Sequence, residues 1–256
     1  MKRRKFCASV LAVAAGPLAP ALARAETTNV MVGVKQGMRA MLLTPGGTGP
    51  VPAILLLHTS GGLSQADIDF GQRLAQEGYV VLVPAFLEAY GIGPRERRAT
   101  FTSDAESIYA DFLAALDMLS RHPRVTGRKF GAIGFSNGGY FAMWLAATAK
   151  VQAGVSYYGA LSGAGTDKEL SRFKGTFNRG SSPVLILHGS ADGTVPFTAA
   201  ERLSKVVAAA GSPCEFHLYE GADHRFDRSG GAEDQAAAAD AWQRTLVFFG
   251  KYLKQA

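Results

Sequence analysis

Residues 130–140 read FGAIGFSNGGY and decide the fold of the chain. The first five are apolar or small, as in a buried strand, and a helical pattern follows over 140–147. The turn between them is GFSNG, at 134–138. A strand that turns sharply into a helix strains its apex residue, so the residues two positions before and two positions after must be small. The pattern therefore predicts that Ser136 is exposed at the apex of a strand-helix turn.

Short apolar runs alternate with helical patterns on both sides of this turn. Strands are predicted over 30–34, 38–43, 53–57, 79–83, 130–134, 151–157, 184–188 and 214–219. Helices are predicted from apolar periodicity and from two capping pairs, Ser64 with Asp67 and Thr198 with Glu201. This order predicts one α/β domain over 26–256, with a mostly parallel sheet of about eight strands, flanking helices and an antiparallel N-terminal edge. In such sheets the chemistry lies at the carboxyl ends of the strands.

The composition excludes several classes of protein. The 256 residues are 47% hydrophobic and 19% charged, which is too apolar for a disordered chain. No internal run of 18 uncharged apolar residues predicts a membrane-spanning helix. The net charge of +6 depends on five basic residues within 1–25, and 26–256 holds 22 basic against 21 acidic residues. The charge therefore gives no reason to expect a nucleic-acid partner.

Residues 1–25 have the organisation of a cleaved export signal. A cationic start is followed by a moderately apolar stretch over 6–23 and by the small-residue site ARA at 23–25. The RRKF run at 3–6 resembles a twin-arginine signal, with the Sec route as the alternative. We expect a periplasmic or secreted protein that uses the export machinery and keeps no stable membrane anchor; an uncleaved anchor is the alternative. Cleavage would leave Cys214 as the only cysteine, so no intrachain disulfide is expected.

A reactive serine needs a base within hydrogen-bond reach, and a carboxylate that orients the base. The ends of two later strands supply both. Asp192 lies in a tight turn after the strand at 184–188, and His224 lies in the loop after the strand at 214–219. The chain order Ser136, Asp192, His224 is that of the catalytic triad in α/β-hydrolases. We expect these residues to be nucleophile, acid and base.

The other histidines are assigned structural positions. His122 lies in an Arg-His-Pro turn and His217 lies within a predicted strand. His188 ends a strand directly before the acid turn, and we expect it to order that turn by hydrogen bonding. His224 is therefore the preferred base.

The neighbouring carboxylates are weaker candidates for the acid. Asp223 and Asp227 are too near His224 in sequence to support its ring readily, whereas Glu220 is a possible substitute for Asp192. The sequence contains neither a His-Glu-x-x-His motif nor paired cysteines, so no metal site is expected.

An acyl-transfer site also needs donors for the developing oxyanion. The Asn137 N–H, at the start of the helix after Ser136, is one candidate, and the loop after the strand at 53–57 offers Thr59 or Ser60 as the second. The two glycines that follow at 61–62 could instead serve only to relieve the turn.

Taken together, these motifs resemble those of the dienelactone hydrolases, over nearly the whole chain after residue 25. The resemblance is carried by His58 with its Gly-rich loop, LAQEGYVVLVP at 74–84, GFSNGG at 134–139, HGSADGTVP at 188–196, GADHRF at 221–226 and AWQRTLVFF at 241–249. It implies the α/β-hydrolase fold and the hydrolysis of carboxylic esters or lactones through a covalent acyl-enzyme, without a cofactor.

Two positions depart from that family's usual pattern. Typical members have cysteine where this chain has Ser136, and usually have glutamate directly after the histidine, where this chain has Thr59. An exported serine enzyme of this kind is more similar to a broad carboxylesterase acting on small-molecule esters or lactones. The alternatives are a peptidase or acylaminoacyl-type amide hydrolase, and a non-catalytic exported binding protein with a vestigial triad.

Two long loops near the active edge, 86–103 and 161–182, are expected to influence substrate choice. An apolar substrate pocket is predicted from three aromatic residues, with core packing as the alternative: Phe86, Tyr90 and Tyr140. The three arginines within 95–98 could attract a substrate carboxylate, but a solvated face is the preferred interpretation.

Overall fold

The computed structural model describes residues 30–35, 38–93, 95–159 and 167–255. The predicted export signal over 1–25 and the first part of the 161–182 loop lie outside the described residues. Among the described residues, no helix combines the length and apolar character needed to cross a membrane.

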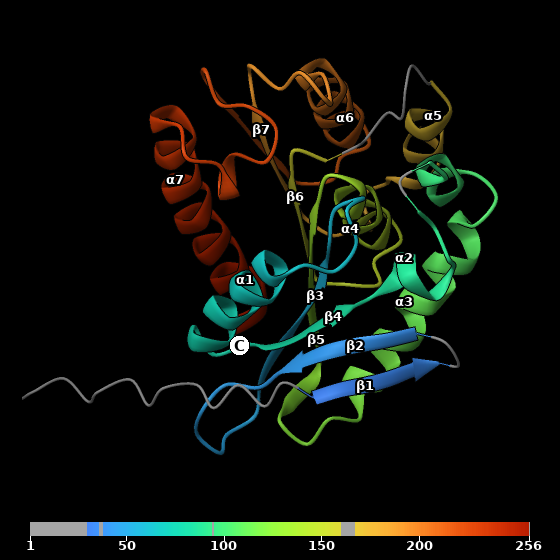
Figure 1. Cartoon of the computed structure of the whole chain (residues 1–256), viewed down its shortest axis with the longest axis vertical. Coiled ribbons are helices and arrows are strands. Elements are labelled where there is room, and N and C mark those ends of the chain that lie inside the picture. Colours follow the sequence, from blue (N-terminus) through green and yellow to red (C-terminus); the bar gives the residue numbers. More distant parts are fainter. Residues whose placement is uncertain (1–29, 36–37, 94, 160–166, 256) are drawn as a thin grey trace, which may run out of the picture.

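The described part of the chain forms a single sheet of eight strands with helices on both faces (Figure 1). The strand order is β1-β2-β4-β3-β5-β6-β7-β8. The bounds are β1 Val30–Lys35, β2 Met38–Leu43, β3 Val51–Leu57, β4 Val80–Pro84, β5 Val125–Phe135, β6 Ala153–Tyr157, β7 Val184–Gly189 and β8 Cys214–Tyr219. β2 runs antiparallel to β1 and to β4, and all other neighbours are parallel. The predicted sheet and its antiparallel edge are confirmed.

The central strands are apolar along their whole length because helices cover both of their faces. Every residue of β4, β6 and β7 is buried, and so are the last five of β3. β8, at the edge, is only partly covered and alternates between exposed and half-buried residues. The continuous apolar runs in the sequence therefore correspond to the central strands, and the loops that hold the candidate site residues follow the carboxyl ends of strands in this sheet.

Two groups of helices cover the two faces (Figure 1). α1 (Gln65–Gln76) and α7 (Ala232–Phe249) pack on one face through side chains such as Phe70, Leu74 and Trp242. The other face is covered by α3 Ala105–Ser120, α4 Asn137–Ala147, α5 Asp167–Thr176 and α6 Phe197–Ala209. The short elements are α2 Phe86–Ala89, the 3-10 helices η1 Arg97–Phe101 and η2 Phe226–Arg228, and the π-helix η3 Gly250–Lys254.

Two helix predictions have different outcomes. The Ser64 N–H and hydroxyl both donate to the Asp67 carboxylate, so the predicted pair at the start of α1 is confirmed. The predicted Thr198–Glu201 pair is wrong, because α6 already begins at Phe197, directly after Pro196. Pro196 is the N-cap, with an extended ψ of 129°, so Thr198 lies inside the helix as its second residue.

Candidate active site

Ser136 lies at the apex of the turn between β5 and α4. Its φ of 50° and ψ of −110° are unusual for a non-glycine residue, and its N–H donates to the Tyr157 carbonyl across the sheet at 3.0 Å. The strained apex agrees with the predicted turn geometry, but the predicted exposure of Ser136 is wrong, because only 6% of the residue is exposed. The apex is held by hydrogen bonding to the neighbouring strand β6, so the turn and the sheet edge form one rigid unit.

The small residues of the turn are required by close approach of the backbone. A Cβ at Gly134 would lie 2.1 Å from the Gly138 carbonyl oxygen, and one at Gly138 would lie 2.1 Å from the Leu57 carbonyl oxygen. A Cβ at Gly139 would lie 2.6 Å from the Ser156 hydroxyl. These contacts allow α4 to start directly against the ends of β3 and β6.

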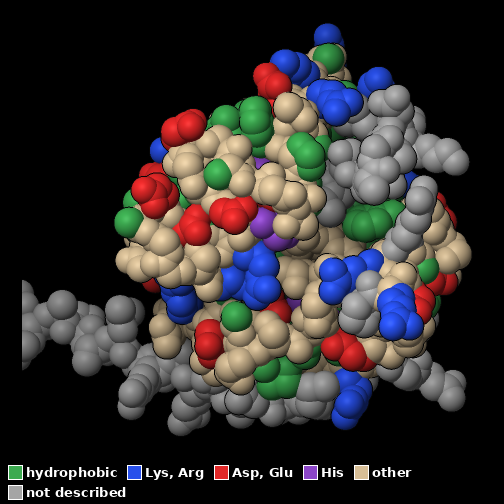
Figure 2. Space-filling model, turned by 45° about the horizontal axis from the view of Figure 1, so that its top comes forward, with side chains coloured by type: hydrophobic (Ala, Val, Ile, Leu, Met, Phe, Trp, Pro, Cys, Tyr) green, Lys and Arg blue, Asp and Glu red, His purple; other side chains and the backbone are tan. Residues whose placement is uncertain are grey.

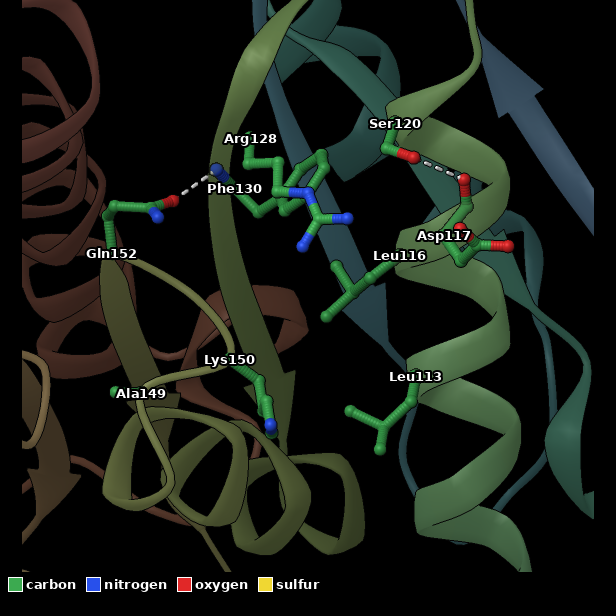
Figure 3. Close-up of a pocket in the computed structure, with 9 residues that line it drawn as sticks. All are labelled: Leu113, Leu116, Asp117, Ser120, Arg128, Phe130, Ala149, Lys150 and Gln152. Carbon is green, nitrogen blue, oxygen red and sulfur yellow. Dashed lines mark hydrogen bonds between the residues drawn. The ribbon is translucent and has the colours of Figure 1, made fainter.

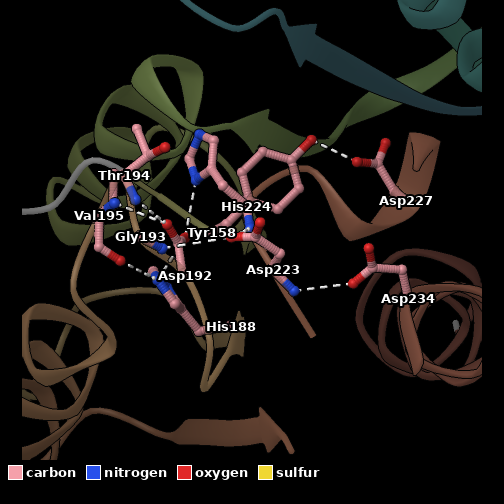
Figure 4. A network of polar contacts seen from close by, with 10 residues as sticks. All are labelled: Tyr158, His188, Asp192, Gly193, Thr194, Val195, Asp223, His224, Asp227 and Asp234. Atoms are coloured by element: carbon pink, nitrogen blue, oxygen red, sulfur yellow. Dashed lines mark hydrogen bonds and ion pairs between the residues drawn. The ribbon is translucent and has the colours of Figure 1, made fainter. Parts of the chain in front are cut away.

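Asp192 and His224 are joined by a hydrogen bond at the same edge of the sheet (Figure 4). The distance from His224 Nδ1 to Asp192 Oδ2 is 2.8 Å, and the carboxylate side chain has no exposed surface. A carboxylate accepts only, so Nδ1 carries the proton and Nε2 is left as an acceptor. The imidazole, with 12% of its side chain exposed, is therefore in the tautomer that a general base requires.

The turn around Asp192 holds its carboxylate with further donors. Oδ1 accepts from the N–H groups of Thr194, at 2.9 Å, and Val195, at 2.7 Å. His188 Nε2 lies 3.1 Å from Oδ2 and donates to the Val195 carbonyl at 2.9 Å. Burial raises the pKa of Asp192, but the hydrogen bonds from His188, His224 and Val195 outweigh it and lower the pKa below its ordinary value. The expectation that His188 orders the acid turn is confirmed.

The neighbouring aspartates have other contacts. Asp223 accepts from the N–H groups of His224 and Gly193, which joins the base loop to the acid turn. Asp227 accepts from the Tyr158 hydroxyl at 2.5 Å (Figure 4). Of the carboxylates in this part of the described chain, Asp192 is the one that contacts the His224 ring.

Ser136 and His224 lie at the same edge of the sheet. The Ser136 N–H bonds to Tyr157, and the ring of the next residue, Tyr158, lies edge-on to the His224 ring at 4.8 Å between centroids. Figure 2 turns the top of the molecule towards the viewer and shows histidine surface near the middle of this face, among basic and acidic side chains. In the described chain no hydrogen bond joins the Ser136 hydroxyl to His224, and such bonds are often long before substrate binds.

The predicted oxyanion donors lie at the start of α4 and in the loop after β3. Asn137 is the first residue of α4, so its N–H has no partner within the helix, and its side-chain amide donates to the Thr100 hydroxyl at 3.2 Å. The loop after β3 lies against α4, since a Cβ at Gly138 would be 2.8 Å from the His58 carbonyl oxygen. Among the described residues, the N–H groups of Thr59 and Ser60 make no hydrogen bond.

The three predicted pocket residues lie at different depths. Phe86 and Tyr140 have no exposed surface and pack in the aromatic core; Phe86 stacks on His58 at 4.0 Å. Their prediction as lining residues of an open pocket is wrong in this structure, because the core on the α4 side of the sheet takes up both rings. Tyr90 is half-buried, and its hydroxyl donates to Asp111 at 2.6 Å. Arg95 and Arg97, from the same loop, are exposed.

A buried ionic cluster beside His224 was not predicted. Arg228 donates to Asp227 at 2.9 Å and to Asp67, at the start of α1, at 3.2 Å. The guanidinium also lies over the Phe135 ring, next to Ser136, at 4.9 Å. The cluster ties the base loop to the start of α1. Asp67 and Arg228 are 161 positions apart, and no local pattern could have linked them.

A cavity of about 330 Å³ lies elsewhere, between α3 and the amino ends of β5 and β6 (Figure 3). Its lining includes Leu116, Arg128, Phe130 and Lys150. Arg128 and Phe130 lie in the first six residues of β5 and Gln152 directly precedes β6, so this cavity is remote from the edge that holds Ser136. Within the described ranges, no group of three or more His, Cys, Asp or Glu side chains could hold a metal ion.

Comparison with known proteins agrees with this geometry. Residues 38–253 match the dienelactone hydrolase family. A "putative carboxymethylenebutenolidase" of Methylorubrum extorquens is 30% identical over 232 residues, covering 86% of this chain and 78% of the relative. The carboxymethylenebutenolidase of Rhodococcus opacus is 28% identical, covering 80% and 83%.

A solved structure extends the comparison to the fold. The crystal structure of a "putative dienelactone hydrolase" from Klebsiella pneumoniae superposes with a TM-score of 0.71 at 26% identity, covering 84% of this chain and 93% of that one. The chain therefore belongs to the dienelactone hydrolase family of the α/β-hydrolase fold and is a carboxylic ester hydrolase of that family.

Proposed function

We propose that this enzyme cleaves small carboxylic esters or lactones through an acyl-enzyme on Ser136, with His224 as the base and Asp192 as the acid that orients it. The observation that carries the proposal is the buried Asp192–His224 hydrogen bond of 2.8 Å, at the edge where Ser136 tops its strand-helix turn. The bond leaves His224 Nε2 as an acceptor for the serine proton.

The reaction then proceeds in two halves. His224 Nε2 takes the Ser136 proton as Oγ attacks the carbonyl carbon, and it returns the proton to the alcohol that leaves. Water, deprotonated by the same nitrogen, then attacks the acyl group and releases the acid. The N–H of Asn137 and that of Thr59 or Ser60 would stabilise the tetrahedral oxyanion. Each donor would lower the activation free energy by about 3 kcal/mol.

The substrates are proposed to be small and varied. Ser136 stands where typical members of the family have cysteine, which favours a broad carboxylesterase over the cysteine-dependent reaction typical of the family. No cofactor enters the proposed steps.

The proposal is tested by Ser136→Ala with Ser107→Ala as the matched control, because Ser107 is exposed on α3. The Ser136 variant should keep its circular dichroism spectrum and melting temperature but lose p-nitrophenyl ester turnover and fluorophosphonate labelling. The control should retain both. Turnover by Ser136→Ala at the wild-type rate would remove Ser136 from the mechanism.

The same assays separate the two alternatives. An amide hydrolase of the peptidase type would cleave peptide or acylaminoacyl substrates at rates comparable with esters, whereas we expect esters to be strongly preferred. A non-catalytic binding protein with a vestigial triad would react with no serine-directed phosphonate.

We also propose that the enzyme is exported, by the twin-arginine route, to the periplasm or beyond. The proposal rests on the RRKF run and the ARA site of residues 1–25. Replacing both Arg3 and Arg4 with Lys should retain the full-length precursor inside the cell, as fractionation would measure. Unchanged export of that variant would favour the Sec route.

A further inference from the structure

The side chain of Glu88, on α2, reaches across to the loop after β3. Its Oε1 accepts the Leu63 N–H at 3.1 Å, and its Oε2 lies 3.8 Å from His58 Nε2. These contacts are at the two ends of the segment 58–63. The carboxylate therefore spans the loop that holds the predicted oxyanion donors Thr59 and Ser60.

Gly62 makes this approach possible. It has a φ of 83°, and a Cβ at this position would lie 2.8 Å from Glu88 Oε1. Any larger residue would both strain the backbone and displace the carboxylate from the Leu63 N–H. The second glycine of the Gly-rich loop thus leaves room for the Glu88 side chain.

The hydrogen bond to Leu63 is the contact that holds the loop. His58 donates from Nδ1 to the Thr59 carbonyl at 2.7 Å, and its ring is fully buried against Phe86. Burial lowers the pKa of His58, so the ring is neutral near pH 7 and forms no ion pair with Glu88. The loop has only short internal bonds otherwise, from Gly62 to the Thr59 carbonyl and from Gly61 to the Thr59 hydroxyl.

We propose that Glu88 is a positioning residue that fixes the 58–63 loop, and with it the N–H groups of Thr59 and Ser60, for stabilisation of the oxyanion. The inference rests on the proposed function, because it assigns Glu88 to the same reaction. Glu88 itself contacts no reacting atom. Because a fixed oxyanion donor acts on the transition state more than on the bound substrate, loss of Glu88 should lower kcat with little change in KM.

The test compares Glu88→Ala and Glu88→Gln in the full enzyme. Glu88→Ala removes the acceptor, and we expect kcat for a p-nitrophenyl ester to fall about 10-fold or more with KM within about 2-fold. Glu88→Gln keeps an oxygen that can accept from Leu63 and should restore kcat to within about 3-fold of the wild type. Glu201→Ala is the matched control: Glu201 is similarly exposed, at 44% against 53%, and pairs with Lys205 on α6.

Amide hydrogen exchange of peptides covering 58–63 provides a readout that does not depend on activity. Exchange should be faster in Glu88→Ala than in the wild type and in Glu201→Ala. An unchanged kcat in Glu88→Ala, or a Glu88→Gln variant as slow as Glu88→Ala, would overturn the inference. If the wild type neither turns over esters nor labels with phosphonate while exchange responds as expected, the proposed function fails and the loop contact stands.

Discussion

The Asp192 carboxylate is surrounded by hydrogen-bond donors. Two backbone N–H groups and two imidazoles point at one carboxylate whose side chain has no exposed surface. A buried carboxylate without such partners would be costly, so the turn that supplies the N–H groups and the two histidines stabilises the ionised form. These contacts keep Asp192 ionised and hold the His224 imidazole in one tautomer.

Asp192→Asn should reduce kcat by about 10³-fold to 10⁴-fold, because an amide that donates to Nδ1 would leave the imidazole in the wrong tautomer. Steady-state kinetics would measure the loss, and circular dichroism should show an unchanged fold. Asp117→Asn, at an exposed position on α3, serves as the control. A loss of less than 10-fold would argue for another acid, with Glu220 the first to replace in turn.

The same carboxylate should contribute to stability in a pH-dependent way. Its pKa is lowered in the folded state, so its stabilising contribution is present above the unfolded value of about 3.9 and is lost as the pH falls towards the folded pKa. The difference in unfolding free energy between wild type and Asp192→Asn should therefore be present at pH 5 and shrink below about pH 4. Urea titrations at several pH values would measure it; a difference that grows in acid would contradict the assignment.

The turn between β5 and α4 shows how elements position a side chain. β5 and β3 pair in parallel, and α4 starts so close to both that backbone atoms take the place that side chains would need. Ser136 is strained because it is the single residue between the end of the strand at Phe135 and the start of the helix at Asn137. The packing of three elements, rather than a preference of serine, therefore produces the strained apex at which Ser136 lies, with 6% of the residue exposed.

Gly138→Ala should be strongly destabilising, by about 3 kcal/mol or more, because its Cβ would overlap the Leu57 carbonyl. Gly175→Ala is the matched control. Gly175 lies in α5 with no atom within 4 Å of an added Cβ, and alanine should stabilise that helix by about 0.5 kcal/mol or leave it unchanged. Chemical denaturation would measure both. Equal stability of the two variants would contradict the close contact at the turn.

The direction of the parallel strands separates the candidate triad from the cavity beside α3. Ser136, Asp192 and His224 follow the carboxyl ends of β5, β7 and β8, whereas the 330 Å³ cavity lies at the amino ends of β5 and β6 (Figures 3 and 4). Chemistry in open α/β sheets belongs at the carboxyl ends. The cavity therefore lies away from the edge at which the proposed triad is found.

Replacing both basic side chains that line the cavity, in an Arg128→Ala, Lys150→Ala double variant, should leave kcat/KM for small esters within about 2-fold of the wild type. Both side chains are exposed, and the described chain pairs neither with an acid. Steady-state kinetics would measure the ratio. A drop of 10-fold or more would mean that the cavity communicates with the reaction, contrary to the placement of the chemistry at the other edge.

Much of this architecture could be predicted from local sequence. Burial on both faces of a strand requires a continuous apolar run, and a tight strand-helix turn requires small residues at fixed positions, so the sheet and the turn at Ser136 left clear patterns. The α5 helix has a weaker pattern, because its residues are largely polar, and the sequence predicts only a loop over 161–182.

Contacts between distant segments were decided by the tertiary structure alone. Periodicity tells which residues are buried but not which residues they meet, so it could not separate a core role from a pocket role for Phe86 and Tyr140. In the same way, the pairing of Arg228 with Asp67 and the reach of Glu88 to Leu63 depend on which strand ends the sheet order brings together. The sequence determined the elements and the order of the reactive residues along the chain. The folding of parallel strands into one sheet determined which side chains share an edge, because the spatial order of the strands depends on contacts between distant segments.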